Sequence, residues 1–218
     1  MSRSLALAAC NLSLRRYLTR FASARKPAMT TITVVKKGRE VAIAADCQST
    51  FGDTRLTATH DARSNKIFEL DGSFFAISGS AAHDLVLQAA LSKLKSRQFD
   101  SRPAIFETFR KLHPKLKDDF FLKTEEEEDD PYESSQMTVL IANPHGIFAV
   151  YSMREVYEFN QFWAIGSGRD YAVGAMWAAW PQLEGAAEIA QLGVQAGCEF
   201  DVGTSLPMTL FTTRLAAE

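Results

Sequence analysis

The spacing of apolar and polar positions divides this chain into strand and helix segments. Short runs rich in Val, Ile, Phe and Thr, bounded by Gly, Asp, Asn or Pro, predict β-strands. These runs cover residues 30–37, 40–46, 66–70, 73–78, 137–142, 147–151, 156–165 (as one or two strands) and 207–213. The run from Val41 to Ala45 is apolar at every position, which is typical of a strand covered on both faces. The polar residues 47–64 predict a loop or an irregular hairpin.

Apolar residues three and four positions apart predict helices in other segments. We expect them over residues 81–95, 103–120, 171–180 and 186–196. Pro103 suits the start of its helix, whereas Pro114 should bend or interrupt it because proline has no backbone N–H. Strands and helix pairs alternate along the chain. This order predicts an α+β fold with four layers, in which two stacked sheets are each covered by a helix pair.

The composition of the 218 residues, 46% hydrophobic and 23% charged, is typical of a soluble globular domain with one sizeable core. Residues 1–29 stand apart because they contain six Lys and Arg and no acid. They resemble an amphipathic transit peptide, but they could also be a pro-segment, or translation could start at Met29. In each case we exclude this leader and expect a single domain over residues 30–218. No apolar run reaches the ~18 residues that a membrane span needs.

The rest of the chain is acidic and poor in cysteine. Without the six basic leader residues, 18 of the 24 Lys and Arg remain against 26 Asp and Glu, a net charge of about −8. This balance argues against nucleic-acid binding, which depends on basic surface. Cys10, Cys47 and Cys198 have no paired spacing, which indicates neither a disulfide framework nor a zinc site and fits a reducing compartment. We therefore expect no metal and no cofactor.

The first predicted strand begins with a residue that can act as a nucleophile. If the chain is cut after Met29, Thr30 holds both a hydroxyl group and a free α-amine. A threonine hydroxyl is a weak nucleophile until a base takes its proton, and an α-amine with a pKa of about 7.7 to 8.0 can serve as that base. The alternative is that Thr30 merely opens a Thr-rich strand, since Thr is common in strands.

Two charged residues stand at strand positions that point toward apolar faces. Alternate positions place Thr30 with Ile32 and Val34, Asp46 with Ala42 and Ala44, and Lys66 with Phe68 and Leu70. An unpaired charge on an apolar face costs several kcal/mol, so we expect Asp46 and Lys66 to meet each other. Taken singly, Asp46 could open a turn and Lys66 could reach water.

Five segments follow one another along the chain: Thr30-Thr31-Ile32, Asp46, Lys66-Ile67-Phe68-Glu69-Leu70, Ser78-Gly79-Ser80-Ala81 and Gly166-Ser167-Gly168. In this order they resemble the signature of proteasome β-type subunits, a family of N-terminal-nucleophile threonine peptidases that includes bacterial HslV. The resemblance extends from Met29 to the C-terminus. The long first helix pair, the acidic residues 125–132 and the segment 163–169 most resemble the beta-proteobacterial homologue in this family. The resemblance implies the four-layer αββα sandwich of N-terminal-nucleophile hydrolases.

The resemblance also implies roles for individual residues. Thr30 would attack the peptide carbonyl while its amine accepts the proton, Lys66 would stay charged beside it, and Asp46 would hold Lys66. The backbone N–H of Gly79 would bind the oxyanion, and Ser167 and Asp201 would orient the amine. Substrate-channel positions in the family correspond here to Ser49, Thr50, Phe51, Phe68 and Ile77.

The sequence departs from the family pattern at two places. The interval from Asp46 to Lys66 is about four residues longer than usual, so the match at Lys66 depends on the Lys-Ile-Phe-x-Leu motif. Self-cleaving relatives have Gly before the nucleophile, whereas this chain has Met29. Removal of an initiating Met29 is therefore the simplest route to a free Thr30, and translation from Met1 would require another protease.

We therefore expect a threonine endopeptidase subunit of a ring-shaped protease that cleaves unfolded polypeptides in an enclosed chamber. The resemblance implies a homo-oligomeric double ring, a tetradecamer as in proteasomes or a dodecamer as in HslV, and leaves open an ATP-dependent unfoldase as partner. The expected location is the bacterial cytoplasm, or the mitochondrial matrix if the leader is a transit peptide. Two alternatives stay open: an N-terminal-nucleophile amidohydrolase for small amides, and a catalytically inactive ring-building subunit.

Overall fold

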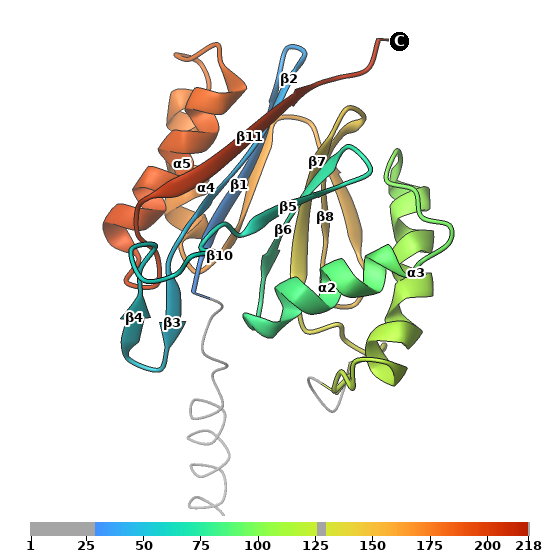
Figure 1. Ribbon diagram of the computed structural model, residues 1–218. Helices are drawn as coiled ribbons and strands as arrows, with labels where there is room; N and C mark the ends of the chain where they lie inside the picture. The colour runs from blue at the N-terminus through green and yellow to red at the C-terminus, as the bar shows by residue number, and fades with distance from the viewer. Residues whose placement is uncertain (1–28, 126–129, 218) are drawn as a thin grey trace, which may run out of the picture.

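Two antiparallel sheets stacked face to face form the centre of the molecule (Figure 1). They are seen in a computed structural model, which describes residues 29–125 and 130–217. The predicted leader, apart from Met29, and the middle of the acidic segment therefore lie outside the described residues. The described residues form the predicted α+β fold with its four layers.

The first sheet has the strand order β10-β1-β2-β11, and the second has the order β5-β6-β7-β8-β9. The first sheet consists of β10 (Phe162–Gly166), β1 (Thr31–Lys37), β2 (Glu40–Asp46) and β11 (Met208–Arg214). The second consists of β5 (Ile67–Leu70), β6 (Ser73–Ser78), β7 (Thr138–Asn143), β8 (Gly146–Val150) and β9 (Val156–Phe159). A separate hairpin is formed by β3 (Ser49–Phe51) and β4 (Thr54–Leu56). The polar segment that follows β2 is thus an irregular hairpin, as one of the two interpretations predicted.

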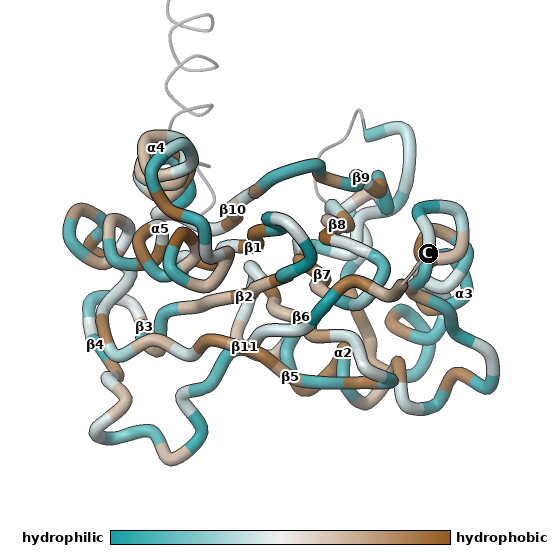
Figure 2. Tube along the Cα trace, turned by 90° about the horizontal axis from the view of Figure 1, so that it is seen from above, coloured by the Kyte–Doolittle hydropathy of each residue, from teal (hydrophilic) through white to brown (hydrophobic). Residues whose placement is uncertain are grey.

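A helix pair covers the outer face of each sheet. Helices α4 (Arg169–Ala179) and α5 (Ala186–Phe200) pack on the first sheet, and α2 (Ala82–Ser92) and α3 (Arg102–Asp118) pack on the second. Seen from above, the two pairs lie on opposite sides of the stacked sheets (Figure 2). Within the described parts of the chain, no helix has the length and apolar character required to cross a membrane.

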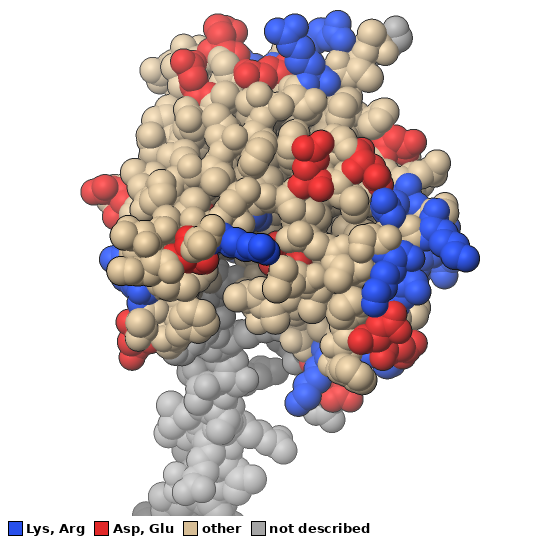
Figure 3. Space-filling model, in the orientation of Figure 1, with Lys and Arg blue, Asp and Glu red and all other residues tan. Residues whose placement is uncertain are grey.

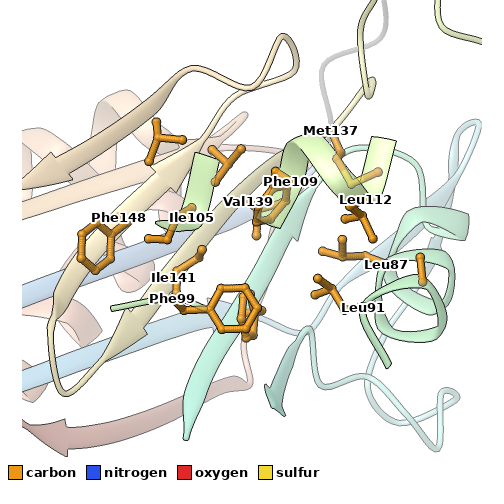
Figure 4. Close-up of a cluster of buried hydrophobic side chains, with 14 of the residues drawn as sticks. Leu87, Leu91, Phe99, Ile105, Phe109, Leu112, Met137, Val139, Ile141 and Phe148 are labelled. Atoms are coloured by element: carbon orange, nitrogen blue, oxygen red, sulfur yellow. The ribbon is translucent and has the colours of Figure 1, made fainter. Parts of the chain in front are cut away.

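Three apolar clusters hold the layers together. One lies between the sheets and includes Ile32, Ile43 and Leu140, and a second joins the first sheet to α4 and α5. The third joins the second sheet to α2 and α3, where Leu87, Leu91, Phe99, Ile105, Phe109, Leu112, Met137, Val139, Ile141 and Phe148 interlock (Figure 4). Since β1, β2 and β7 are buried on both faces, their backbones have little freedom to shift, and the residues at their ends are fixed accordingly.

Pro114 was expected to bend or interrupt its helix, and helix α3 shows that it does not interrupt it. The helix begins with Pro103 in its first turn, as predicted, and continues through Pro114 to Asp118. Proline removes one backbone hydrogen bond, but Leu112 and Leu116 on either side are buried against the second sheet. The apolar contacts on both sides of Pro114 therefore hold the helix together across the missing bond.

The segment 156–165 forms two strands that belong to different sheets. Strand β9 pairs with β8 in the second sheet, whereas β10 pairs with β1 in the first. This crossing places Gly166 opposite Thr31 at the start of β1. It brings the Gly-Ser-Gly segment, which is far away in sequence, beside Thr30.

Candidate active site

Thr30, Asp46 and Lys66 form one hydrogen-bonded cluster. The Thr30 hydroxyl donates to Asp46 Oδ1 at 2.7 Å, and Lys66 Nζ donates to Thr30 Oγ1 at 2.9 Å and to Asp46 Oδ1 at 2.8 Å. Asp46 is fully buried, and its carboxylate also accepts the backbone N–H groups of Thr31 and Gln48. The cost of burying this carboxylate is therefore offset by four hydrogen bonds, one of them from the ammonium group of Lys66.

The predicted meeting of Asp46 and Lys66 is confirmed, but the strand-face reason for it was wrong. Ala42 and Ala44 face the α4–α5 cluster, whereas Phe68 packs on the α2–α3 cluster, so the two predicted faces lie on opposite sides of the sandwich. The side chains meet because Asp46 is the last residue of β2 and Lys66 precedes β5. At these ends the chain leaves the sheet, and alternation along the strand no longer fixes the direction of a side chain.

Ser167 and Asp201 approach Thr30 from the other side. The Thr30 N–H donates to Ser167 Oγ at 3.2 Å, and the Ser167 hydroxyl donates to Asp201 Oδ2 at 2.5 Å. Ser167 follows β10, and Asp201 directly follows α5. In the full chain this nitrogen is an amide bonded to Met29, which cannot accept a proton. Cleavage between Met29 and Thr30 would convert it into an amine that already faces the Ser167 hydroxyl, which is in turn bonded to the Asp201 carboxylate.

A cleft of about 900 Å³ opens beside Thr30 and Lys66. Predicted substrate-binding residues Ser49, Thr50, Phe51 and Ile77 line it, and so does Gly79, the predicted oxyanion donor. Phe68, the fifth predicted substrate-binding residue, is not among the residues that line this cleft. Its ring stacks on Phe75 with centroids 5.2 Å apart and packs against the α2–α3 core. Ile67, the first residue of β5, points into the core between the sheets, so the next side chain, Phe68, points to the opposite face.

The sequence analysis missed Gln48 and Asp84. Gln48 is fully buried beside Asp46, and Asp84 lines the cleft from the first turn of α2. Burial raises the pKa of the Asp84 carboxyl, and a hydrogen bond from the Gln88 amide opposes that shift. Gln48 carried a signal, since it lies two residues after Asp46 at the end of a strand, and an aspartate at a turn commonly accepts the N–H two residues on. Asp84 carried none, because an acid in a first helical turn is common.

The cysteines near the cluster are poor competitors for the role of nucleophile. Burial raises the pKa of the Cys47 thiol, and burial together with the negative charge of Asp46 raises the pKa of Cys198 to about 11. Both residues therefore stay protonated at neutral pH, and a thiol is far less reactive than a thiolate. Among residues 29–125 and 130–217, no group of three or more His, Cys, Asp or Glu side chains is placed to hold a metal ion.

Gly166 is required by the backbone next to the cluster. It has φ +96°, and a Cβ there would lie 2.1 Å from the carbonyl oxygen of Thr30. We expect Gly166→Ala to lower the free energy of unfolding by about 2 to 4 kcal/mol, because both the strained backbone and the clash with main-chain atoms must be accommodated. Urea unfolding of the purified variant measures this.

The control for Gly166→Ala is Gly174→Ala in α4. A Cβ at Gly174 meets nothing within 4 Å, so this change should stabilise the protein by up to about 1 kcal/mol, as expected for a helical glycine. Equal unfolding midpoints for the two variants would contradict the strain at Gly166.

Solved structures similar to this chain include two of one bacterial protein and one of a eukaryotic protein. BPH of Thiobacillus denitrificans has a TM-score of 0.81 and 41% sequence identity, over 87% of this chain and 100% of BPH. The same protein in complex with epoxomicin has a TM-score of 0.80 and 41% identity, over 86% of this chain and 100% of that protein. Eukaryotic HslV from Trypanosoma brucei has a TM-score of 0.60 and 20% identity, over 84% of this chain and 98% of HslV. This similarity shows a shared fold. No protein-family model and no curated protein sequence matches the chain.

Proposed function

Since the chain belongs to the family of proteasome β-type subunits and HslV, we propose that it is a threonine endopeptidase with Thr30 as its N-terminal nucleophile. The family assignment makes it a proteasome-type protease. The observation that carries the finer proposal is the position of Thr30. Its Oγ1 lies 2.9 Å from Lys66 Nζ while its nitrogen faces Ser167, at the edge of a cleft that can hold a peptide.

The reaction begins when Thr30 Oγ1 attacks the carbonyl carbon of the scissile bond. The hydroxyl proton passes to the free α-amine of Thr30, directly or through a water molecule, and the carbonyl oxygen becomes an oxyanion. The backbone N–H of Gly79 is the candidate donor to this oxyanion, a type of contact that contributes about 3 kcal/mol to transition-state binding. The amine then returns the proton to the leaving nitrogen, which leaves an ester on Thr30. Water hydrolyses the ester by the same route and restores the hydroxyl.

Lys66 and Asp46 make the attack possible at neutral pH. A positive charge beside Thr30 Oγ1 stabilises the developing alkoxide and weakens the hold of the hydroxyl on its proton. Asp46 keeps the ammonium group of Lys66 at this position through the 2.8 Å ion pair. In the full chain the Thr30 hydroxyl donates to Asp46, so the proton must be redirected once the amine is free.

The precursor is inactive in this mechanism, because the nitrogen of Thr30 is then an amide. An exposed threonine nucleophile would also cut neighbouring proteins, so we propose that the mature subunits enclose their clefts in a homo-oligomeric double ring and receive unfolded polypeptides, with or without an ATP-dependent unfoldase. We propose a cytoplasmic location, or the mitochondrial matrix if residues 1–29 direct import.

Intact-mass measurement of the purified protein, combined with a substrate panel, tests the function. We expect a mature chain that begins at Thr30, hydrolysis of fluorogenic peptides, and inhibition by epoxomicin, with which the similar BPH was solved in complex. Size-exclusion chromatography reports the ring. A full-length mass with unimpaired peptide hydrolysis would contradict the mechanism. Cleavage of small amides alone would favour an amidohydrolase, and a ring with no hydrolysis at all would indicate an inactive subunit.

A further inference from the structure

The side chain of Gln48 connects the two groups of residues that hold Thr30. On one side is the Thr30–Asp46–Lys66 cluster, and on the other is the Ser167–Asp201 pair. The backbone N–H of Gln48 donates to Asp46 Oδ2 at 2.9 Å, and its side-chain Nε2 donates to the carbonyl oxygen of Val202 at 3.2 Å. Val202 directly follows Asp201, so one buried residue is bonded to Asp46 in the first group and to the chain neighbour of Asp201 in the second.

Arg55 fixes the orientation of the Gln48 amide. Its Nε donates to Gln48 Oε1 at 2.9 Å. An amide group has similar size at both ends, and a half-turn would exchange its oxygen for its nitrogen. With Arg55 present the oxygen must face the guanidinium, because an NH₂ group cannot accept this bond. The NH₂ group is thereby held toward the Val202 carbonyl, where an oxygen would be repelled.

Arg55 acts from outside the cleft. It lies on β4 opposite Thr50, is exposed, and is not among the residues that line the cleft around Thr30. A substrate in the cleft would therefore contact the neighbouring strand β3 and leave Arg55 untouched. The hydrogen bond to Gln48 is therefore the contact through which the Arg55 side chain would affect turnover.

We propose that Gln48 and Arg55 are positioning residues, which hold the 201–203 turn so that Asp201 and Ser167 orient the nitrogen of Thr30. This inference rests on the proposed function. The Asp201 carboxylate accepts a hydrogen bond from the Ser167 hydroxyl, and Ser167 Oγ accepts one from the nitrogen of Thr30. A displacement of the turn is therefore transmitted to this nitrogen, which takes the proton in the proposed reaction. Small displacements of a reacting group lower the rate of the chemical step more than they weaken substrate binding.

The test is steady-state hydrolysis of one fluorogenic peptide by the mature, assembled protein and by three variants. We expect Arg55→Ala to lower kcat about tenfold with KM within about twofold of the starting protein. Arg55→Lys keeps a charged donor and should recover kcat to within about threefold, and Gln48→Glu, which puts an oxygen against the Val202 carbonyl, should lower kcat by about 50-fold.

The matched control is Arg110→Ala, which removes an exposed arginine whose Nε donates to Glu107 at 2.7 Å on the distant helix α3. Its kcat should equal that of the starting protein. Thermal unfolding and size-exclusion chromatography should show Arg55→Ala folded and assembled, since the residue is exposed.

Three outcomes would overturn the proposal: an unchanged kcat in Arg55→Ala, a rise in KM that accounts for the whole loss, or no recovery in Arg55→Lys. Failure of the proposed function looks different. The starting protein itself would then be no more active than its Thr30→Ala variant.

Discussion

We expect Thr30→Ala to abolish peptide hydrolysis by the mature protein, with a fall in kcat of about 10³-fold or more. The change removes the only atom that forms a bond with substrate in the proposed reaction, while the α-amine, Lys66 and Asp46 remain. Fold and assembly should persist, because the side chain is small and the cluster keeps its ion pair. The measurement is hydrolysis of a fluorogenic peptide after the leader has been removed.

The control for this variant is Thr30→Ser, which retains the hydroxyl and should keep a measurable part of the activity. Intact mass must show the same N-terminus in both proteins, so that a processing defect is not counted as a catalytic one. Undiminished hydrolysis by Thr30→Ala would refute the assignment of the nucleophile and leave only the fold and the family.

Lys66→Ala should destroy activity and also destabilise the protein. Its ammonium group is the charge that compensates the Asp46 carboxylate, which is fully buried. Removal of one member of a buried ion pair leaves an unpaired charge and costs about 3 to 5 kcal/mol. We therefore expect a large decrease in the urea unfolding midpoint together with loss of turnover.

A double variant separates the two effects of Lys66. Asp46→Asn combined with Lys66→Met removes both charges and leaves neutral groups of similar size, so much of the lost stability should return while turnover stays absent. Arg110→Ala, which breaks an exposed pair with Glu107, should leave the unfolding midpoint nearly unchanged. Equal stability of Lys66→Ala and Arg110→Ala would contradict the burial of an uncompensated charge.

Local contacts determine the electrostatics at Thr30 more than the charges spread over the protein surface do. Figure 3 shows charges of both signs on this face, with Lys and Arg gathered most densely on the α2–α3 side. Exposed charges separated by more than about 8 to 10 Å are largely screened at physiological salt. The buried pair of Asp46 and Lys66 is screened much less and therefore dominates the electrostatics at Thr30.

The sequence by itself determined the elements and their layers. Period-two runs and turn residues located the strands, and helical spacing located α2 to α5, because these signals are local and each element must bury one face. The ordered motifs around Thr30, Asp46, Lys66 and Ser167 were visible for the same reason, since the residues of each motif are neighbours in the chain.

Only the tertiary structure decided which of these residues touch. Strand alternation gave the wrong faces for Asp46 and Lys66, since the chain turns where a strand ends and the turn is set by distant contacts. The sequence pattern relates Gln48 to Asp46, but it does not show the contact between the Gln48 side chain and Val202, which lies more than 150 residues away. Side-chain direction at strand ends depends on packing between layers, and a linear pattern does not contain that information.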